Sequence, residues 1–247
     1  MKAIILAAGR GTRLKPLTDE SPKCLTEVNG KTILENMLLA LTNKGVKEVY
    51  LVIGYLGDKI RERVGAKVNN IVINYVENPI YDRTNNTYSL LLALESLTLN
   101  EGESLLILEG DVFFNDNLIS DFIKHPIDNS TIVEPYNSSL DGSFVEVDNG
   151  FILDWTHKLF RPENYVVDDK YKTVNIHKFS KDFVNERLYP SLREHVENDG
   201  GTQPIEYVFR DIIKTKNGRI SVFLASDYKW IEIDDLSDLR AAESMFK

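Results

Sequence analysis

The sequence has a single cysteine, Cys24, among its 247 residues. One thiol cannot form an internal disulfide, and alone it gives no indication of a metal site. No N-terminal apolar segment is long enough for a signal peptide or a membrane span, so we expect a cytoplasmic protein without membrane contacts. No repeat, low-complexity tract or Pro/Ser-rich linker divides the chain. With 43% hydrophobic residues it can bury a sizeable core, and we expect one domain over residues 1–247.

Long basic runs are also missing. The formal net charge is −9 and the pI is about 5.1, which disfavours a general nucleic-acid-binding protein. Positive charge is instead concentrated in the first 25 residues, where only Asp19 and Glu20 are acidic. The cations there are Lys2, Arg10, Arg13, Lys15 and Lys23. This local excess indicates an anionic ligand near the N-terminus.

The strongest functional signal follows the apolar run Ala3–Ala8. This run has the length of a buried strand and is followed by Gly9-Arg10-Gly11-Thr12-Arg13, with Lys23 further on behind Pro22. Glycines let backbone N–H groups approach an anion without a Cβ in the way. Arg13 and Lys23 then supply positive charge where phosphates would sit. The pattern is typical of the active-site loop of an enzyme that binds and uses a nucleoside triphosphate.

Two familiar phosphate-binding motifs are incomplete in this region. A dinucleotide-binding fingerprint needs a third glycine where the chain has Leu14. A Walker-type loop at Gly30-Lys31-Thr32 lacks its leading glycine, which is replaced by Leu25. A solvated loop with incidental charges is the alternative for a lone Gly-x-Gly, but Arg13 and Lys23 make it less favourable.

Strands alternate with helices through the first half of the chain. We expect strands at Ala3–Ala8, Glu48–Ile53, Ile71–Tyr75 and Ser104–Leu108, and helices at Ile33–Asn43, Asp58–Val64 and Thr87–Leu97. Thr32 and Glu35 have the spacing of a capping box, and Asn85 or Asn86 would cap the third helix. This rhythm predicts an α/β fold, with a Rossmann-like, mostly parallel sheet that has helices on both faces and gathers ligands at the carboxyl ends of its strands.

The second half predicts a smaller mixed β region. Ser143–Val147 and Gly150–Trp155 alternate like a hairpin around Asp148-Asn149-Gly150. We expect further strands at Thr173–Phe179, Arg219–Leu224 and Lys229–Ile233, the last two paired, and helices at Lys181–Val196, Ile205–Lys214 and Leu236–Phe246. Asp199-Gly200-Gly201-Thr202 is expected to be a flexible loop, with a role as a lid left open.

The segment from Leu6 to Lys23, L-A-A-G-R-G-T-R-L-K-P-L-T-x-x-x-P-K, resembles the signature of the nucleotidyltransferases. These enzymes join a nucleoside triphosphate to a phosphorylated small molecule and release pyrophosphate. Later landmarks of the family are similar to Val52-Ile53-Gly54-Tyr55, Leu108-Glu109-Gly110-Asp111 and Trp230-Ile231-Glu232-Ile233-Asp234. The resemblance implies a nucleotide-diphospho-sugar transferase-like fold. Since the chain stops at Lys247, it is most similar to the compact cytidylyltransferases for phosphocholine and related amino-alkyl phosphates or phosphonates.

The reaction of this family needs neutralising charge and in-line placement more than a proton carrier. Mg²⁺ suits this chemistry, because it prefers oxygen ligands and takes one or two carboxylates together with substrate phosphates. Asp111 and Asp234 are the candidate metal ligands, and the resemblance implies one aspartate from each motif on the metal. Which neighbouring carboxylates assist is left open among Glu109, Glu232 and Asp235.

The resemblance also implies roles for other residues. Arg13 would grip the triphosphate, and Lys23 would bridge the α-phosphate and the attacking phosphate. The expected nucleotide-binding residues are Leu6, Ala7, Ala8, Gly9, Gly11, Thr12, Tyr88 and Ser89. The expected acceptor-binding residues are Asp82, Asn86, Trp155 and Lys172.

A cationic head group on the acceptor would favour aromatic faces and a carboxylate. The residues from which such a cage could be drawn are Tyr81, Asp82, Tyr88, Tyr136, Trp155, Glu206, Tyr228 and Trp230. Core or surface packing is the alternative for each aromatic side chain. The four histidines, His125, His157, His177 and His195, have no ligand-like partner at a useful spacing, so we expect them to be structural or surface groups.

The favoured interpretation is a Mg²⁺-dependent cytidylyltransferase that transfers CMP from CTP to a small phosphorylated or phosphonate acceptor. The acceptor would be of the phosphocholine, phosphoethanolamine or 2-aminoethylphosphonate type. One alternative is a sugar-1-phosphate nucleotidylyltransferase that uses UTP, dTTP or GTP. Another is a non-catalytic nucleotide-binding regulatory module, against which Arg13, Lys23, Asp111 and Asp234 together argue. The oligomeric state is left open, with a homodimer among the options.

Overall fold

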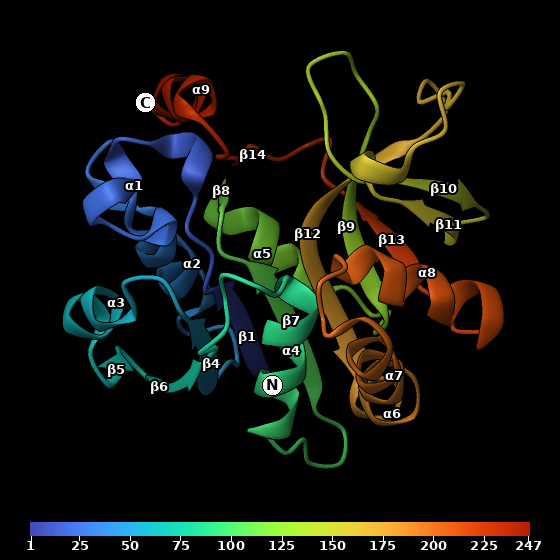
Figure 1. The fold of residues 1–247 in the computed structure, drawn as a ribbon, viewed down its shortest axis with the longest axis horizontal. Helices are drawn as coiled ribbons and strands as arrows, with labels where there is room; N and C mark the ends of the chain where they lie inside the picture. Colours follow the sequence, from blue (N-terminus) through green and yellow to red (C-terminus); the bar gives the residue numbers. More distant parts are fainter.

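The computed structural model describes all residues, 1–247, and its centre is a ten-stranded mixed sheet with helices on both faces (Figure 1). In spatial order the strands are β10 (Phe144–Asp148), β11 (Phe151–Thr156), β13 (Ser221–Leu224), β9 (Ser130–Pro135), β12 (Tyr171–Ser180), β7 (Ser104–Glu109), β1 (Lys2–Ala7), β4 (Glu48–Ile53), β6 (Ile71–Glu77) and β5 (Lys67–Val68). Two small pairs lie outside this sheet: β8 (Val112–Phe114) with β14 (Trp230–Glu232), and β2 (Glu27–Val28) with β3 (Lys31–Thr32). The expected α/β class is confirmed.

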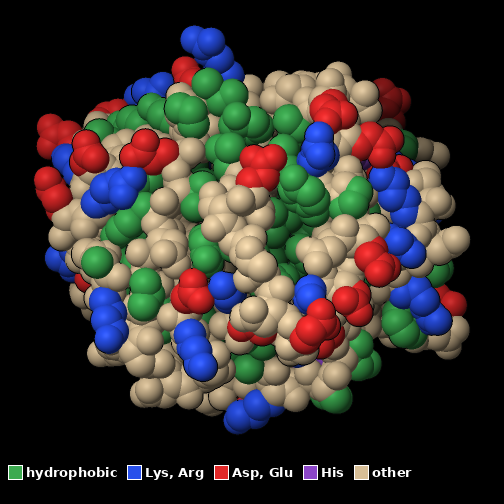
Figure 2. Space-filling view, turned by 90° about the horizontal axis from the view of Figure 1, so that it is seen from below, with side chains coloured by type: hydrophobic (Ala, Val, Ile, Leu, Met, Phe, Trp, Pro, Cys, Tyr) green, Lys and Arg blue, Asp and Glu red, His purple; other side chains and the backbone are tan.

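The helices are α1 (Leu17–Glu20), α2 (Ile33–Leu41), α3 (Gly57–Val64), α4 (Asn86–Glu95), α5 (Asp116–Lys124), α6 (Lys181–Phe183), α7 (Tyr189–Asp199), α8 (Ile205–Thr215) and α9 (Leu236–Met245). Short 3₁₀ turns occur at Thr12–Leu14, Lys23–Leu25 and Lys158–Phe160. No helix in the structure combines the length and the apolar character needed to cross a membrane. On the face drawn in Figure 2, Lys and Arg side chains are interspersed with Asp and Glu and form no continuous basic band.

Strands β7, β1, β4 and β6 form a parallel core, and their register is continuous along β1. Strands β1, β4 and β7 are almost wholly apolar because both faces of the sheet are covered there, whereas the outer strand β6 alternates between buried and exposed residues. Ile4 and Leu6 of β1 pack into the cluster that includes residues of α4, α7 and α8. Ala3 and Ile5, which point the other way, pack into the cluster that includes residues of α2, α5 and α9. The loop that follows β1 therefore begins at the end of a strand that is packed against helices on both faces.

The two predicted helix caps are confirmed. Thr32 Oγ1 accepts from Glu35 N at 3.0 Å, and a Glu35 carboxylate oxygen accepts from Thr32 N at 3.0 Å, so both halves of the capping box are present. Asn85 is the N-cap of α4, and its side-chain oxygen accepts from the backbone N–H of Asn86 at 2.8 Å. Such contacts satisfy N–H groups that have no partner within the helix.

The predicted pairing of the last two strands is wrong. β13 instead pairs in parallel with β9, which the sequence did not reveal, and β14 pairs antiparallel with β8. Strand pairing over such long separations is decided by tertiary packing and not by local pattern. The observed β14 pairing has a functional consequence, because the N–H of Ile233 donates to the carbonyl of Asp111 at 2.9 Å. Asp234 is thereby brought beside the end of β7.

Two further expectations differ from the structure. The predicted helix Lys181–Val196 is interrupted by a π-helical segment at Val184–Leu188, next to Pro190, whose nitrogen cannot donate to the preceding turn. The loop Asp199–Thr202 is held against α4: Asn85 N donates to Gly201 O at 2.8 Å. The loop is therefore anchored at this point instead of standing free as a lid.

Candidate active site

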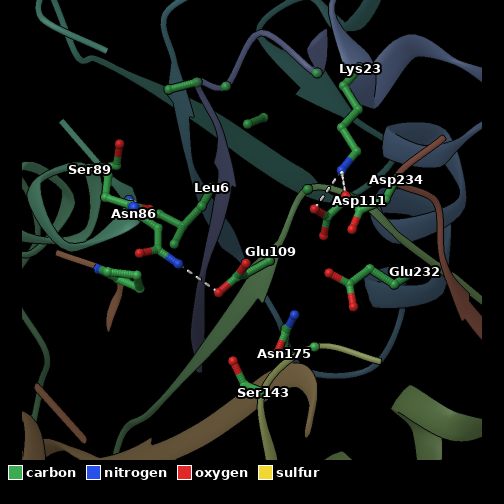
Figure 3. Close-up of a pocket in the computed structure, with 18 of the residues that line it drawn as sticks. Leu6, Lys23, Asn86, Ser89, Glu109, Asp111, Ser143, Asn175, Glu232 and Asp234 are labelled. Atoms are coloured by element: carbon green, nitrogen blue, oxygen red, sulfur yellow. Dashed lines mark hydrogen bonds and ion pairs between the residues drawn. The ribbon is translucent and has the colours of Figure 1, made fainter. Parts of the chain in front are cut away.

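A cavity of about 480 Å³ opens at the carboxyl ends of β1 and β7, beside the first half of β12 (Figure 3). Only 6 of its 29 lining residues are hydrophobic, so the chemistry of its walls suits a polar ligand. The predicted residues that line it are Leu6, Ala7, Ala8, Gly9, Gly11, Thr12, Arg13, Lys23, Asn86, Ser89, Asp111, Lys172 and Asp234. The structure therefore brings most of the candidate site together.

The loop after β1 takes its form from Gly11. Its φ of +63° lies in the left-handed region, and a Cβ there would come within 2.7 Å of the Cβ of Lys23. The hydroxyl of Thr18 donates to the carbonyl of Gly11 at 2.8 Å and holds the loop. Lys23 can therefore extend directly beneath the loop and reach the cavity.

The close contact between β1 and the end of β7 requires Gly110. Its N–H donates to the carbonyl of Leu6 at 2.9 Å, and an added Cβ would lie 2.6 Å from that same oxygen. Because the neighbouring atom belongs to a backbone buried in the sheet, it cannot move aside cheaply. Gly110 thus allows Asp111 to lie directly beside the end of β1.

Gly110→Ala is therefore expected to lower the free energy of unfolding by about 1–3 kcal/mol, measured by urea denaturation. Gly9→Ala is the matched control, since no atom lies within 4 Å of the site of its Cβ and its φ is not in the left-handed region. The control should change stability by less than about 0.5 kcal/mol. Equal stabilities for the two variants would show that the approach of β7 to β1 is not as tight as described.

Four charged side chains meet at one end of the cavity. Lys23 Nζ lies 2.8 Å from Asp111 Oδ2 and 2.7 Å from Asp234 Oδ1, as the dashed lines in Figure 3 show. Arg13 also reaches Asp234 Oδ1 at 2.8 Å. Burial alone would lower the pKa of Lys23, but the two carboxylates outweigh burial and raise it above its ordinary value. Lys23 is therefore a permanent cation held between two aspartates.

The pKa of Asp234 is shifted in the opposite direction. Burial would raise it, but the ammonium of Lys23 and then the guanidinium of Arg13 hold the pKa of this carboxyl below its usual range. Asp234 is thus ionised under neutral conditions. An ionised carboxylate is the form that a cationic ligand requires.

The donor set of this cluster fits a hard divalent cation. One carboxylate oxygen from each of Asp111, Glu232 and Asp234 lies within 4.8 Å of the others. Asp111 Oδ1 is buried without a hydrogen-bond partner, so it has a vacant acceptor position. Mg²⁺ prefers oxygen ligands of this kind. Asp235 is not part of the cluster, because its Oδ1 accepts from Ser237 N at 2.7 Å and caps α9.

Lys172 lines the cavity but is buried, with its ammonium engaged by the protein. Its Nζ lies 2.9 Å from Glu232 Oε2 and donates to the carbonyl of Thr173 at 2.6 Å. Gly142 makes room for it, since a Cβ at that position would lie 2.6 Å from Lys172 Cε. Burial raises the pKa of Glu232, and the nearby Lys172 opposes this rise. Lys172 therefore balances the charge of Glu232.

A second acidic group, Glu109 and Glu206, lies on the cavity wall. Asn86 Nδ2 donates to Glu109 Oε1 at 2.9 Å, and Ser143 Oγ donates to Glu206 Oε1 at 2.5 Å. Burial raises the pKa of Glu109 well above its ordinary value, and the charge of Glu206 adds to this. From the sequence, Glu206 was only one of several residues considered for a cage around the acceptor. An acidic residue in the first turn of a helix is common for structural reasons, so its position alone did not indicate a binding role.

Three predicted site residues do not line the cavity. Trp155 is 1% exposed and stacks on Phe209 with ring centroids 4.8 Å apart, so it belongs to the core. Tyr88 packs its Cβ against Gly201, because only positions 86 and 89 of α4 share the face toward the cavity. Asp82 is exposed in the turn that follows β6. These expectations are corrected: strand alternation turns Trp155 away from the cavity, helical phase turns Tyr88 away, and Asp82 lies in a turn outside it.

The histidines divide into different environments. His157, expected to be structural or at the surface, lines the cavity, and burial lowers its pKa while Glu206 opposes the shift. His177 lies in the core with its Nδ1 2.7 Å from Thr131 Oγ1, and burial lowers its pKa to about 3. Cavity residues that sequence reasoning missed altogether include Asn78, Ser143 and Asn175. Each lies outside any recognisable motif, so only the fold reveals it.

A protein-family model described as nucleotidyl transferase matches residues 2–138. The chain is 32% identical over its full length to the CMP-5'-(3-aminopropyl)phosphonate synthase of Streptomyces rubellomurinus, of which it spans 39%. It is also 27% identical to the CTP:phosphoglutamine cytidylyltransferase of Campylobacter jejuni, covering 97% of this chain and 98% of that one. The solved structure of the inositol-1-phosphate CTP transferase from T. maritima superimposes with a TM-score of 0.75 at 24% identity, covering 100% and 95% of the two chains. The expected fold and the expected resemblance are confirmed.

Proposed function

The chain belongs to the nucleotidyl transferase family, and from that premise we propose that it transfers CMP from CTP to a small phosphorylated or phosphonate acceptor and releases pyrophosphate. The observation that carries the proposal is the position of Lys23 between Asp111 and Asp234, on the cavity wall that also contains the glycine loop, Gly9–Arg13. The activities after which the two relatives are named favour a cytidine nucleotide and an acceptor of this class. Phosphocholine, phosphoethanolamine and 2-aminoethylphosphonate are acceptors of this class.

In the proposed reaction, an oxygen of the acceptor phosphate or phosphonate attacks the α-phosphorus of CTP. A bond forms between that oxygen and the α-phosphorus, while the bond from the α-phosphorus to the bridging β-oxygen breaks and pyrophosphate leaves. The second pKa of a phosphate monoester is about 6, so the attacking group is already an anion at neutral pH. The site therefore needs no general base, and its work is to hold two anions in line.

The cations of the first loop are placed for this task. An ammonium has three N–H donors, and Lys23 uses two on its aspartates, which leaves one for a phosphate oxygen in the cavity. Arg13 engages Asp234 through one terminal nitrogen, and its side chain is 58% exposed, so further donors are available for the triphosphate. Backbone groups from Leu6 to Thr12 would complete the nucleotide site.

Mg²⁺ dependence is part of the proposal. When bound, Mg²⁺ would be held by Asp111 and Asp234 with Glu232 nearby, and it would add positive charge to the triphosphate. The vacant Asp111 Oδ1 is the atom that supports this assignment. Charge from the metal, Lys23 and Arg13 would together offset the repulsion between the triphosphate and the attacking anion.

The test is pyrophosphate release from a nucleotide panel of CTP, UTP, dTTP, GTP and ATP, with Mg²⁺ and each of several acceptors. The acceptors are amino-alkyl phosphonates, phosphocholine, phosphoethanolamine, inositol 1-phosphate and sugar 1-phosphates. We expect release with CTP only when a phosphate or phosphonate acceptor is present, together with a CDP- or CMP-linked product of the corresponding mass. A preference for UTP, dTTP or GTP with a sugar 1-phosphate would favour the sugar nucleotidylyltransferase. No release with any pair would favour a non-catalytic module.

A further inference from the structure

The carboxylates of the cavity are not all balanced by cations. Asp111, Glu232 and Asp234 pair with lysine or arginine side chains. Glu109 and Glu206 form no ion pair, and the hydrogen bonds that they receive come from neutral side chains. Two acidic groups on one wall thus have no direct ion pair, and the nearest positively charged or titratable groups of the protein are Lys172, which is engaged by Glu232, and His157.

Of the two acids, Glu206 gives the clearer indication of a ligand. Its side chain lines the cavity, yet the residue is only 7% exposed. Ser143 bonds to Oε1, whereas Oε2 is buried without any hydrogen-bond partner. Leaving a buried carboxylate oxygen unpaired costs free energy, and a positively charged donor in the cavity would remove that cost. The vacant oxygen therefore indicates a cationic ligand.

The neighbouring acid is held in place by a fixed amide. Asn86 Oδ1 accepts from the backbone N–H of Ile205 at 2.9 Å, so the amide nitrogen of Asn86 must face Glu109 (Figure 3). The same contact joins the start of α4 to the start of α8, one residue before Glu206. Both acids are thus oriented by helix termini before any ligand arrives, as a selective binding site requires.

The chemistry of the wall indicates which cation fits. A quaternary ammonium has no N–H and is bound mainly by aromatic faces. Among the aromatic side chains considered for a cage, only Tyr81 lines the cavity, and it packs over Gly54 beside the carbonyl of Ala8, at the loop end. A primary ammonium instead has three N–H donors that suit carboxylate oxygens.

We propose that the acceptor carries a primary ammonium group, which binds between Glu109 and Glu206 while its phosphate or phosphonate faces Lys23. Acceptors of this kind are amino-alkyl phosphonates and phosphates. The inference rests on the proposed function and narrows its acceptor class. It excludes a trimethylammonium head group and an uncharged sugar or polyol as the preferred acceptor.

The experiment compares acceptors that differ only at the amine, using kcat/KM for pyrophosphate release from CTP. The pairs are 3-aminopropylphosphonate with propylphosphonate, and phosphoethanolamine with phosphocholine. We expect each primary amine to exceed its partner by about 10- to 100-fold, the effect of a charged hydrogen-bonded pair. A preference for phosphocholine, inositol 1-phosphate or a sugar 1-phosphate, with pyrophosphate released, would overturn this inference and leave CMP transfer intact. No release with any acceptor would contradict the proposed function itself.

A variant then tests the assigned carboxylate. Glu206→Gln keeps the size and removes the charge, and should lower kcat/KM for 3-aminopropylphosphonate by about 10- to 100-fold, mainly through KM, with propylphosphonate changed by less than about twofold. Glu62→Gln, at an exposed glutamate of α3 without an ion pair, is the control. Equal losses with both acceptors would indicate a structural role and overturn the assignment. Should Glu206→Gln not fold, Ser143→Ala provides the same comparison, with selectivity for the amine reduced.

Discussion

Asp111→Asn is expected to reduce the rate of CMP transfer by about 10³-fold while the protein stays folded. The amide is nearly isosteric with the carboxylate, but it has no negative charge for a divalent cation and offers one oxygen in place of two. Asp111 also contributes the buried Oδ1 that no protein group satisfies, so the substitution removes the atom best suited to the metal. The rate is measured as single-turnover formation of the cytidine-linked product with CTP and 3-aminopropylphosphonate.

Asp116→Asn is the matched control for this variant. Asp116 lies in the first turn of α5, pairs with Lys44 at 2.9 Å, and has a side chain that is 61% exposed. It should retain activity within about twofold, because exposed pairs of this kind contribute little. An active Asp111→Asn variant, with unchanged thermal midpoint, would remove Asp111 from the site.

Lys23→Met is expected to lower the free energy of unfolding by about 3 kcal/mol in metal-free buffer. The change removes the shared cation from Asp111 and Asp234 and leaves two carboxylates facing each other in a half-buried site. Activity should fall as well, since the phosphate contact is lost. The stability effect is measured by urea denaturation in the presence of a chelator.

The same variant predicts a particular response to metal. In the natural protein the positive charge of Lys23 beside the two aspartates weakens the binding of a cation, whereas in Lys23→Met that repulsion is absent. Mg²⁺ at 100 times its Kd should restore up to about 2.7 kcal/mol to the variant and clearly less to the natural protein. Lys15→Met, which alters an exposed i,i+4 pair with Asp19, is the control and should respond like the natural protein. An equal response of all three proteins would contradict a metal site at these aspartates.

Local signals in the sequence were sufficient for the parts of the fold that depend on neighbouring residues. The apolar run before Gly9, the Thr32 capping box and the turn at Asn149-Gly150 each predict their element because the physical cause lies within a few residues. The same holds for the glycine loop and Asp111, whose positions follow from the ends of parallel strands.

Features set by tertiary packing could not be predicted in this way. The pairing of β14 with β8 depends on residues more than 100 positions apart, and it is this pairing that places Asp234 beside Asp111. Trp155 shows the converse problem, since an aromatic side chain that suits a ligand cage also suits the core in which it lies. Glu206 has an ordinary place at a helix start, and only the three-dimensional structure reveals its unpaired oxygen.

The central claim is that the α-phosphorus of CTP is attacked by the acceptor within the cavity formed by the glycine loop, Lys23 and the two aspartates. The most direct test uses CTP labelled at the α-phosphate in one reaction and at the γ-phosphate in another, each with Mg²⁺ and 3-aminopropylphosphonate. The account predicts that the α-label appears in a cytidine-linked product of the acceptor and that the γ-label appears in pyrophosphate. An α-label found only in free CMP or CDP, or a γ-label transferred to the acceptor, would contradict it.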